Sequence, residues 1–537
     1  MDVMLSDLVE RDTPRLNSDL ADGLATTHVT QAEKYIHQVF VSASKGFPEG
    51  LLYLGYARCT PQEEYNVVTK KKGAKQGARP TFDVARSDLF MVKYLFSYKG
   101  EELEPRYLYL PFVSDAGCIT VSGSRFNISP VLADRVISIG TFNIFFRLLR
   151  DRLTFERMSQ HFMIDGKRET VQVVWAPIYH KDAKMKKLKA TVRANCSLVH
   201  YLFCKYGFTD TFVKFANCKP IIGGAEVNKN VYPESEWVIC SSTQVKPKGV
   251  GRSFYEPSYV NVAVRKEDMT PLVKNMLGGF FYILDHFPAR IKPEYVDNTR
   301  LWMVLLGHII FSGAIAEGTL HDDIRDHISS LDNYLDTIVV NTLKDIGIVV
   351  EDIYQLFAIV IERFNDWLLS GTDKVSSMYD KELSILYFVL YDITKAIFTL
   401  HFKLKAASKK DLTAKEIVAK MNATLRTGLI YFITRQHREV TTVSSPGDNK
   451  AFKLTSILIP QSSLNKGSNK SVVVLDDPAH RLHVSVAEIG GYLNLPKSDP
   501  SGRARLNLTV DVDEKGVVLR SEKHRELLEG IQESIRR

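Results

Sequence analysis

The chain has 537 residues, of which 45% are hydrophobic and 25% charged, and its formal net charge is +8. This composition is that of a globular protein and excludes disordered and fibrous classes. A chain of this length usually divides into roughly two to four domains. The mild positive balance is a weak indication of a polyanionic partner.

The cysteines and the apolar segments indicate in which cellular compartment the protein is expected. The six cysteines form no CxxC pair, which argues against a zinc ribbon and favours reduced thiols in a cytosolic compartment. The N-terminus lacks the apolar region of a signal peptide. The most apolar stretch, residues 301–315, is shorter than the about 20 residues that a bilayer requires, so we expect no membrane association.

The first 140 residues predict a helix followed by strands. Residues 1–45 have a helical pattern with one apolar patch that contains Tyr35, Ile36, Val39 and Phe40. Aromatic and β-branched residues then predict strands at 51–56, 88–98, 107–111 and 118–121, with turns at 115–117 and 122–124. A basic, glycine-rich loop occupies residues 70–79, and it is either a solvated loop or a phosphate contact.

The remaining chain alternates between mixed and helical regions. Apolar spacing predicts a helix over 143–162, a strand over 170–179 and a helix over 194–215. Residues 268–430 are predicted to be mostly helical, because apolar residues recur at helical spacing over about 299–316, 325–369 and 380–404. We expect a break between helices at Gly371. Residues 440–537 read as strands and loops that end in a charged helix from about Ser521.

Motifs for autonomous catalysis are missing from the sequence. It contains no Walker A loop, no GxGxxG between a strand and a helix, no HExxH and no GxSxG. The pairs Asp322–Asp323 and Asp476–Asp477 are more typical of turns and helix N-caps than of a metal site. His200 and Cys204 share a helix face, but no further ligand follows, so a core role is favoured over metal binding.

Clusters of cations are the best candidates for function. Residues 181–193 hold six cations, among them Lys186, Lys187 and Lys189, which suits nucleic acid or an acidic partner subunit. Polar, turn-forming segments near the C-terminus carry further candidates, because arginine forks and small polar groups suit phosphate and sugar contacts. These candidates are Arg435, His437, Arg438, Asn449, Lys450, Arg481, His483, Lys497, Arg503 and Arg505. The alternative for these segments is a surface linker.

The order of these segments resembles the N-terminal half of the β subunit of bacterial-type multisubunit RNA polymerases. In that family a protrusion domain leads into a strand–turn–strand with a proline, two glycines and a serine, and residues 111–125 carry Pro111, Gly117 and Gly123 at these places, with Ser129 beyond. Earlier protrusion strands are similar to residues 51–56 and 82–98.

Later segments resemble the rest of the same half-subunit in the same order. Those similar to the lobe domain are 186–191, 201–209, 326–328 and Asn333. Residues 416–422 and 431–436 are similar to the return into the protrusion. Residues 448–449, 483–485 and 495–507 are similar to the polar turn and the fork loop that lines the RNA–DNA hybrid. Lys497 and Asp499 stand where the family has a threonine–proline–glutamate–glycine signature.

The resemblance implies an α+β, multidomain architecture. A protrusion-like domain would begin in residues 1–140, a lobe-like domain with a helical extension would cover 141–405, the protrusion would return in 406–460, and 461–537 would form a fork-like region and a C-terminal helix. In this architecture, the arginines would bind phosphates, whereas Asn449 and His483 would maintain the loop geometry or contact RNA.

The resemblance also implies the biochemical setting. The chain would be one half of a split β subunit, as in giant bacteriophages, without catalytic residues or a cofactor of its own. Its partners would be DNA, RNA, a β C-terminal-like subunit and a β′-like subunit that carries the catalytic aspartates and Mg²⁺. It would not form a homo-oligomer, and it would act in the cytoplasm of an infected bacterial cell or be carried in the virion.

Two functions of other classes fit parts of the sequence. Long helices between β-rich regions also suit a virion structural or portal-like protein, which would form symmetric homo-oligomers. A DNA-binding replication factor would instead bind DNA without any polymerase partner.

Overall fold

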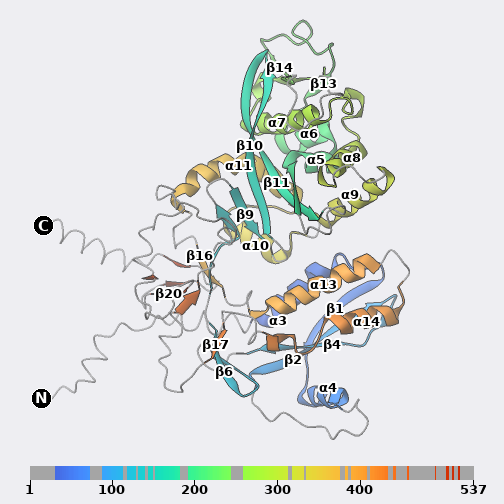
Figure 1. The fold of residues 1–537 in the computed structure, drawn as a ribbon, viewed down its shortest axis with the longest axis vertical. Helices are drawn as coiled ribbons and strands as arrows, with labels where there is room; N and C mark the ends of the chain where they lie inside the picture. Colours follow the sequence, from blue (N-terminus) through green and yellow to red (C-terminus); the bar gives the residue numbers. More distant parts are fainter. Residues whose placement is uncertain are drawn as a thin grey trace, which may run out of the picture. The chain divides into compact units, whose positions relative to one another are not determined.

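The computed structural model shows an α+β protein whose chain divides into two compact units (Figure 1). Unit 1 comprises residues 1–135 and 373–537, and unit 2 comprises residues 136–372. Unit 2 is therefore inserted into the sequence of unit 1. The structure describes residues 31–72, 87–112, 118–128, 131–139, 143–148, 152–181, 191–243, 258–311, 317–331, 334–374, 381–384, 389–407 and 412–432, and short strands at 440–442, 456–458, 490–491, 503–506, 511–512 and 518–519.

Unit 1 contains elements from both ends of the chain. Before the insertion these are α3 (Ala32–Ser44), β1 (Leu51–Arg58), α4 (Pro61–Lys72), β2 (Leu89–Tyr98), β3 (Glu101–Glu102), β4 (Arg106–Pro111), β5 (Cys118–Val121), β6 (Ser124–Ile128) and β7 (Val131–Asp134). After it come β16 (Lys381–Ser384), α13 (Tyr391–Ala407), α14 (Ala414–Thr424), η7 (Leu429–Phe432), β17 (Val440–Thr442), β18 (Ser456–Leu458), β19 (Gly490–Gly491), β20 (Arg503–Leu506), β21 (Asp511–Val512) and β22 (Val518–Leu519).

An antiparallel sheet forms the first half of unit 1, with β2 between β1 and the β3–β4 segment. The tight turn between β2 and β3 has positive φ at both Lys99 and Gly100, which is the geometry that matches the twist of a two-residue hairpin. The strands predicted near 51–56, 88–98, 107–111 and 118–121 are confirmed, and so is the turn at Ser122–Gly123 between β5 and β6.

One apolar face of α3 packs on this sheet. Ile36, Val39, Phe40 and Ala43 recur at helical spacing and are fully buried. The Phe40 ring centroid lies 4.6 Å from that of Tyr94 in β2. The second half of the unit also covers α3, because α13 packs against α3 and the His401 Nδ1–H donates to the Ala43 carbonyl at 2.7 Å.

The chain leaves and re-enters unit 1 at adjoining strands. β7 precedes the insertion and β16 follows it, and the two pair antiparallel with Asp134 opposite Lys381. They belong to a five-stranded sheet in the order β16-β7-β18-β20-β19. The insertion therefore starts and ends within one strand pair of unit 1.

Unit 2 combines an eight-stranded sheet with a set of helices. Its strands are β8 (Ile137–Ile139), β9 (Asn143–Arg147), β10 (Arg152–Ile164), β11 (Lys167–Lys181), β12 (Thr191–Ser197), β13 (Ile221–Gly223), β14 (Trp237–Ser241) and β15 (Asn261–Arg265). Its helices are α5 (Leu198–Tyr206), α6 (Phe208–Ala216), η4 (Lys266–Asp268), α7 (Pro271–His286), η5 (Pro293–Tyr295), α8 (Thr299–Ile310), α9 (Glu317–Leu331), α10 (Thr337–Asp345) and α11 (Ile353–Lys374).

Helix α7 lies close against the long β10–β11 hairpin. A Cβ atom at Gly278 would lie 2.3 Å from Val171 Cγ2, so a residue without a side chain is needed there. The core also contains Trp302, fully buried, whose ring centroid is 4.8 Å from that of Phe203. His200 is buried and its Nε2–H donates to the Trp302 carbonyl at 2.9 Å, which with the burial of Cys204 confirms the predicted core role.

Several helix predictions for this region are wrong. Residues 143–162 form β9 and most of β10, because their apolar residues also alternate, as the buried Ile144, Phe146 and Leu148 do. Residues 194–197 end β12 before α5 begins, and the single segment predicted at 325–369 is divided among α9, α10 and α11. Gly371 lies inside α11 and not at a break, and residues 381–384 form β16 ahead of α13. In the described part of the chain, no helix combines the length and apolarity that crossing a bilayer requires.

A buried carboxyl group lies on α7. Asp285 is 4% exposed, and it accepts hydrogen bonds from Ser242 Oγ at 2.5 Å and from Gln160 Nε2 at 3.0 Å. Burial disfavours its charged form and raises the pKa of Asp285 to about 6, although the two hydrogen bonds act in the opposite direction. Unit 2 therefore contains an acid that titrates near neutral pH.

Replacing this acid should change how stability depends on pH. The folded state holds the Asp285 proton more tightly than the unfolded state does. The protonated carboxyl therefore contributes fully to the free energy of unfolding below the ordinary pKa of 3.8, and this contribution is lost as the pH rises through about 6. We expect Asp285→Asn to stabilise unit 2 relative to the parent by up to about 3 kcal/mol at pH 8, and by clearly less at pH 5. Calorimetric melting at both pH values measures this, and an identical difference at pH 5 and pH 8 would contradict it.

Candidate functional site

A hollow of about 710 Å³ opens in unit 1 where three separate segments meet. The segments are α4, residues 104–107 at the start of β4, and the end of α14 with the residues that follow it. Its polar lining includes Glu63, Glu104, Arg106, Asn422 and Arg426. Residues from both sides of the insertion therefore share one surface.

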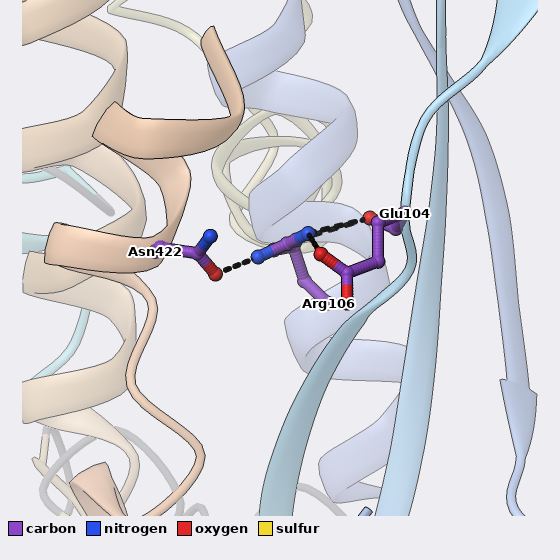
Figure 2. A network of polar contacts seen from close by, with 3 residues as sticks. All are labelled: Glu104, Arg106 and Asn422. Atoms are coloured by element: carbon purple, nitrogen blue, oxygen red, sulfur yellow. Dashed lines mark hydrogen bonds and ion pairs between the residues drawn. The ribbon is translucent and has the colours of Figure 1, made fainter. Parts of the chain in front are cut away.

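Arg106, a buried residue of this lining, joins Glu104 and Asn422 in a network of polar contacts (Figure 2). Its Nε and Nη2 donate to the Glu104 carbonyl at 3.1 and 2.9 Å, and Nη2 also lies 3.1 Å from Glu104 Oε2. Its Nη1 donates to Asn422 Oδ1. Each nitrogen of the guanidinium thus has a hydrogen-bond partner, and the group links β4 to α14.

Local sequence explains how the two partners are positioned. Arg106 occupies the same face of β4 as the buried Leu108 and Leu110, so strand alternation turns it inward. Asn422 lies near the end of α14, a helix that begins with a capping box between Thr413 and Glu416. The backbone also joins the two segments, because Tyr109 N–H donates to the Thr427 carbonyl at 3.1 Å.

The carboxylates of the hollow are compensated. Lys93 Nζ lies 2.6 Å from Glu63 Oε1, and this hydrogen bond lowers the pKa of Glu63. Glu104 is bound by Arg106. Arg426 is exposed and makes no ion pair with any residue that the structure describes. It is thus the available charge at this hollow.

Most of the residues predicted from sequence to bind nucleic acid lie outside the described residues. These are Lys186, Lys187, Lys189, Arg435, His437, Arg438, Asn449, Lys450, Arg481, His483 and Lys497. Arg503 and Arg505 lie in β20, where Arg503 is opposite Leu458 and Arg505 is opposite both Ser456 and Gly491. Nucleic-acid binding by all thirteen residues stays a prediction.

Sequence reasoning missed Arg106, Asn422 and Arg426. One signal for Arg106 was present, because a cation that alternates with apolar residues on the inward face of a strand needs a hydrogen-bonding partner. Nothing near it in sequence identifies Asn422 as that partner. In the part of the chain that the structure describes, no group of three or more His, Cys, Asp or Glu residues is placed to hold a metal ion.

Comparison with known families decides the broader identity. A family described as "Non-virion RNA polymerase subunit" matches residues 4–518. The chain belongs to this family. No curated protein sequence matches it.

Membership makes the chain a subunit of a multisubunit RNA polymerase and implies other polymerase subunits as its partners. The family match favours this interpretation over a virion structural protein or a replication factor. The hollow around Arg106 thus belongs to a polymerase subunit.

Arg106 should matter more to the stability of this polymerase subunit than its ion-pair partner does. Hydrogen bonds to a charged group are worth about 1.5–3 kcal/mol, so Arg106→Ala should destabilise unit 1 by about 2–4 kcal/mol once the lost packing is added. Glu104 has a side chain 62% exposed, so Glu104→Gln should cost less than about 1 kcal/mol.

Urea unfolding followed by probes in each unit measures both variants, and the transition of unit 2 serves as the internal control. Equal losses from the two substitutions would contradict the assigned role of Arg106.

Proposed function

We propose that this polymerase subunit is the N-terminal half of a split β subunit and forms a wall of the DNA and RNA channel. In this role it binds template and hybrid, whereas the catalytic aspartates and their Mg²⁺ belong to a β′-like partner. The chain contributes to the polymerase reaction by positioning nucleic acid.

The insertion of unit 2 into unit 1 is the observation that carries the proposal. In the family that the sequence resembles, a protrusion domain is interrupted by a lobe domain and resumes after it. Here unit 1 is interrupted after residue 135 and resumes at residue 373. A discontinuous unit of this kind, in a chain from an RNA polymerase subunit family, supports the assignment of unit 1 as protrusion-like and unit 2 as lobe-like.

The proposed chemistry is electrostatic. Cations that contact backbone phosphates hold a strand in register without reading its sequence, and their binding weakens as salt rises. The candidates at residues 435–505 and 186–189 suit this role by charge, with Arg503 and Arg505 anchored in β20. The partners that complete the enzyme are a β C-terminal-like and a β′-like subunit.

Purification tests the division of labour. A tag on this chain should co-purify unlike polymerase chains from its native cell, including one with the aspartate-rich metal motif. The isolated chain should incorporate no nucleotides, because the metal-binding residues lie elsewhere. Symmetric homo-oligomers without unlike partners, or nucleotide incorporation by the chain alone, would refute the proposal.

The arginines of β20 offer a second test in the assembled enzyme. Arg503→Ala together with Arg505→Ala should reduce transcript elongation. The two substitutions should also make the negative slope of log Kobs for template binding against log salt shallower by about 1.8, since each lost phosphate contact removes about 0.9. Lys344→Gln, a charge removed from an exposed position on α10, is the control. Unchanged elongation in the double variant would exclude both arginines from the channel.

A further inference from the structure

A second, smaller hollow in unit 1 concentrates positive charge. It measures about 340 Å³ and lies over α13 and the end of α14. Its lining contains Lys395 and Lys403 from α13 and Arg426 from the segment after α14, and all three residues are exposed. Among the lining residues that the structure describes, Asp392 is the one carboxylate, which leaves a formal charge of +2 from three cations and one anion.

These cations are not neutralised within the described part of the chain. Lys403 Nζ donates to Thr424 Oγ1 at 3.3 Å, and Lys395 Nζ lies 5.8 Å from the centroid of the Tyr391 ring. Neither lysine makes an ion pair with a described residue, and the same holds for Arg426. The charge of the hollow is therefore available to an external anion.

Arg426 also lines the larger hollow around Arg106, so the two hollows adjoin at this residue. They differ in charge. In the larger hollow Glu104 is bound by Arg106 and Glu63 by Lys93, which leaves Arg426 as its one cation without an ion pair to a described residue. The smaller hollow has three such cations. An anionic ligand is thus favoured on the α13–α14 side.

The spacing of the lysines indicates an extended ligand. Lys395, Thr399 and Lys403 are four residues apart and share one face of α13. Eight residues of helix span about 12 Å, which is more than one phosphate group can bridge. The same length covers roughly three to four successive phosphates of a B-form strand, at about 3.4 Å each along the axis.

The lining also indicates how a nucleic acid would be held. Proteins that bind single strands usually stack bases on aromatic rings. Besides the charged residues, the described lining of this hollow contains threonine, alanine and leucine, and none of these described residues has an aromatic ring. Contacts to backbone phosphates without base stacking suit a paired helix, whose bases are already stacked.

We propose that the α13–α14 hollow binds the phosphate backbone of double-stranded DNA without sequence preference. The inference rests on the proposed function, because it assigns a DNA contact to the protrusion-like unit. It adds a binding surface built from Lys395, Lys403 and Arg426, which the sequence did not indicate.

Salt-dependent binding of the full-length chain to a fluorescent DNA duplex tests this proposal. Between about 50 and 200 mM KCl, log Kobs falls as log salt rises. Lys395→Gln combined with Lys403→Gln should make this negative slope shallower by about 1.8, because two phosphate contacts are lost. The matched control is Lys34→Gln combined with Lys415→Gln, which removes the same charge from two exposed positions of unit 1 outside both hollows and should leave the slope unchanged. Circular dichroism checks that both variants remain folded.

Four results would overturn the proposal. The first is an equal slope for the two double variants, and the second is no duplex binding by the unaltered chain at about 50 mM KCl. The third is that the hollow variant loses affinity for single-stranded DNA only. The fourth is that polymerase chains no longer co-purify with the hollow variant. The last would mean that the hollow docks an acidic protein surface. Unchanged DNA slopes with all polymerase partners retained would reject this hollow and leave the proposed function intact.

Discussion

The structure of unit 1 depends on one constraint, which is that its core is completed only by residues on the far side of the insertion. Arg106 and Asn422 are 316 positions apart in sequence, yet the buried Arg106 guanidinium donates a hydrogen bond to the exposed residue Asn422. The His401 contact to the Ala43 carbonyl and the bond from Tyr98 Oη to the Leu412 carbonyl at 2.7 Å connect the same two halves. Closing so long a loop costs entropy, but the cost grows only slowly with loop length.

Because both halves of unit 1 must meet, the two ends of the inserted unit 2 must lie close together. β7 and β16 pair antiparallel, so the strands that precede and follow unit 2 are neighbours. Unit 2 has a core of its own, centred on Trp302 and the buried helices α5 and α7. A subunit arranged in this way carries a second unit without opening the sheet of the first, which suits a component of a larger assembly.

The sequence predicted elements well where local pattern and environment agree. The strands β1, β2 and β4 were predicted because aromatic and β-branched residues alternate between clear turns. Residues 143–162 were misassigned because their apolar residues fit both periods, and only pairing with β11 and β14 selects the strand. The site was less predictable. Arg106, Asn422 and Arg426 are brought together by tertiary packing, and the predicted cation clusters followed charge density, which indicates polyanion binding but not where the cations meet.

The most direct test of the central claim is photocrosslinking in a stalled elongation complex. Photoreactive nucleotides placed along the template should crosslink to this chain as well as to the catalytic subunit, because the account makes this chain a wall of the channel. Mass spectrometry then identifies the crosslinked peptides. A fully assembled, transcribing complex in which no template position crosslinks to this chain would contradict the account.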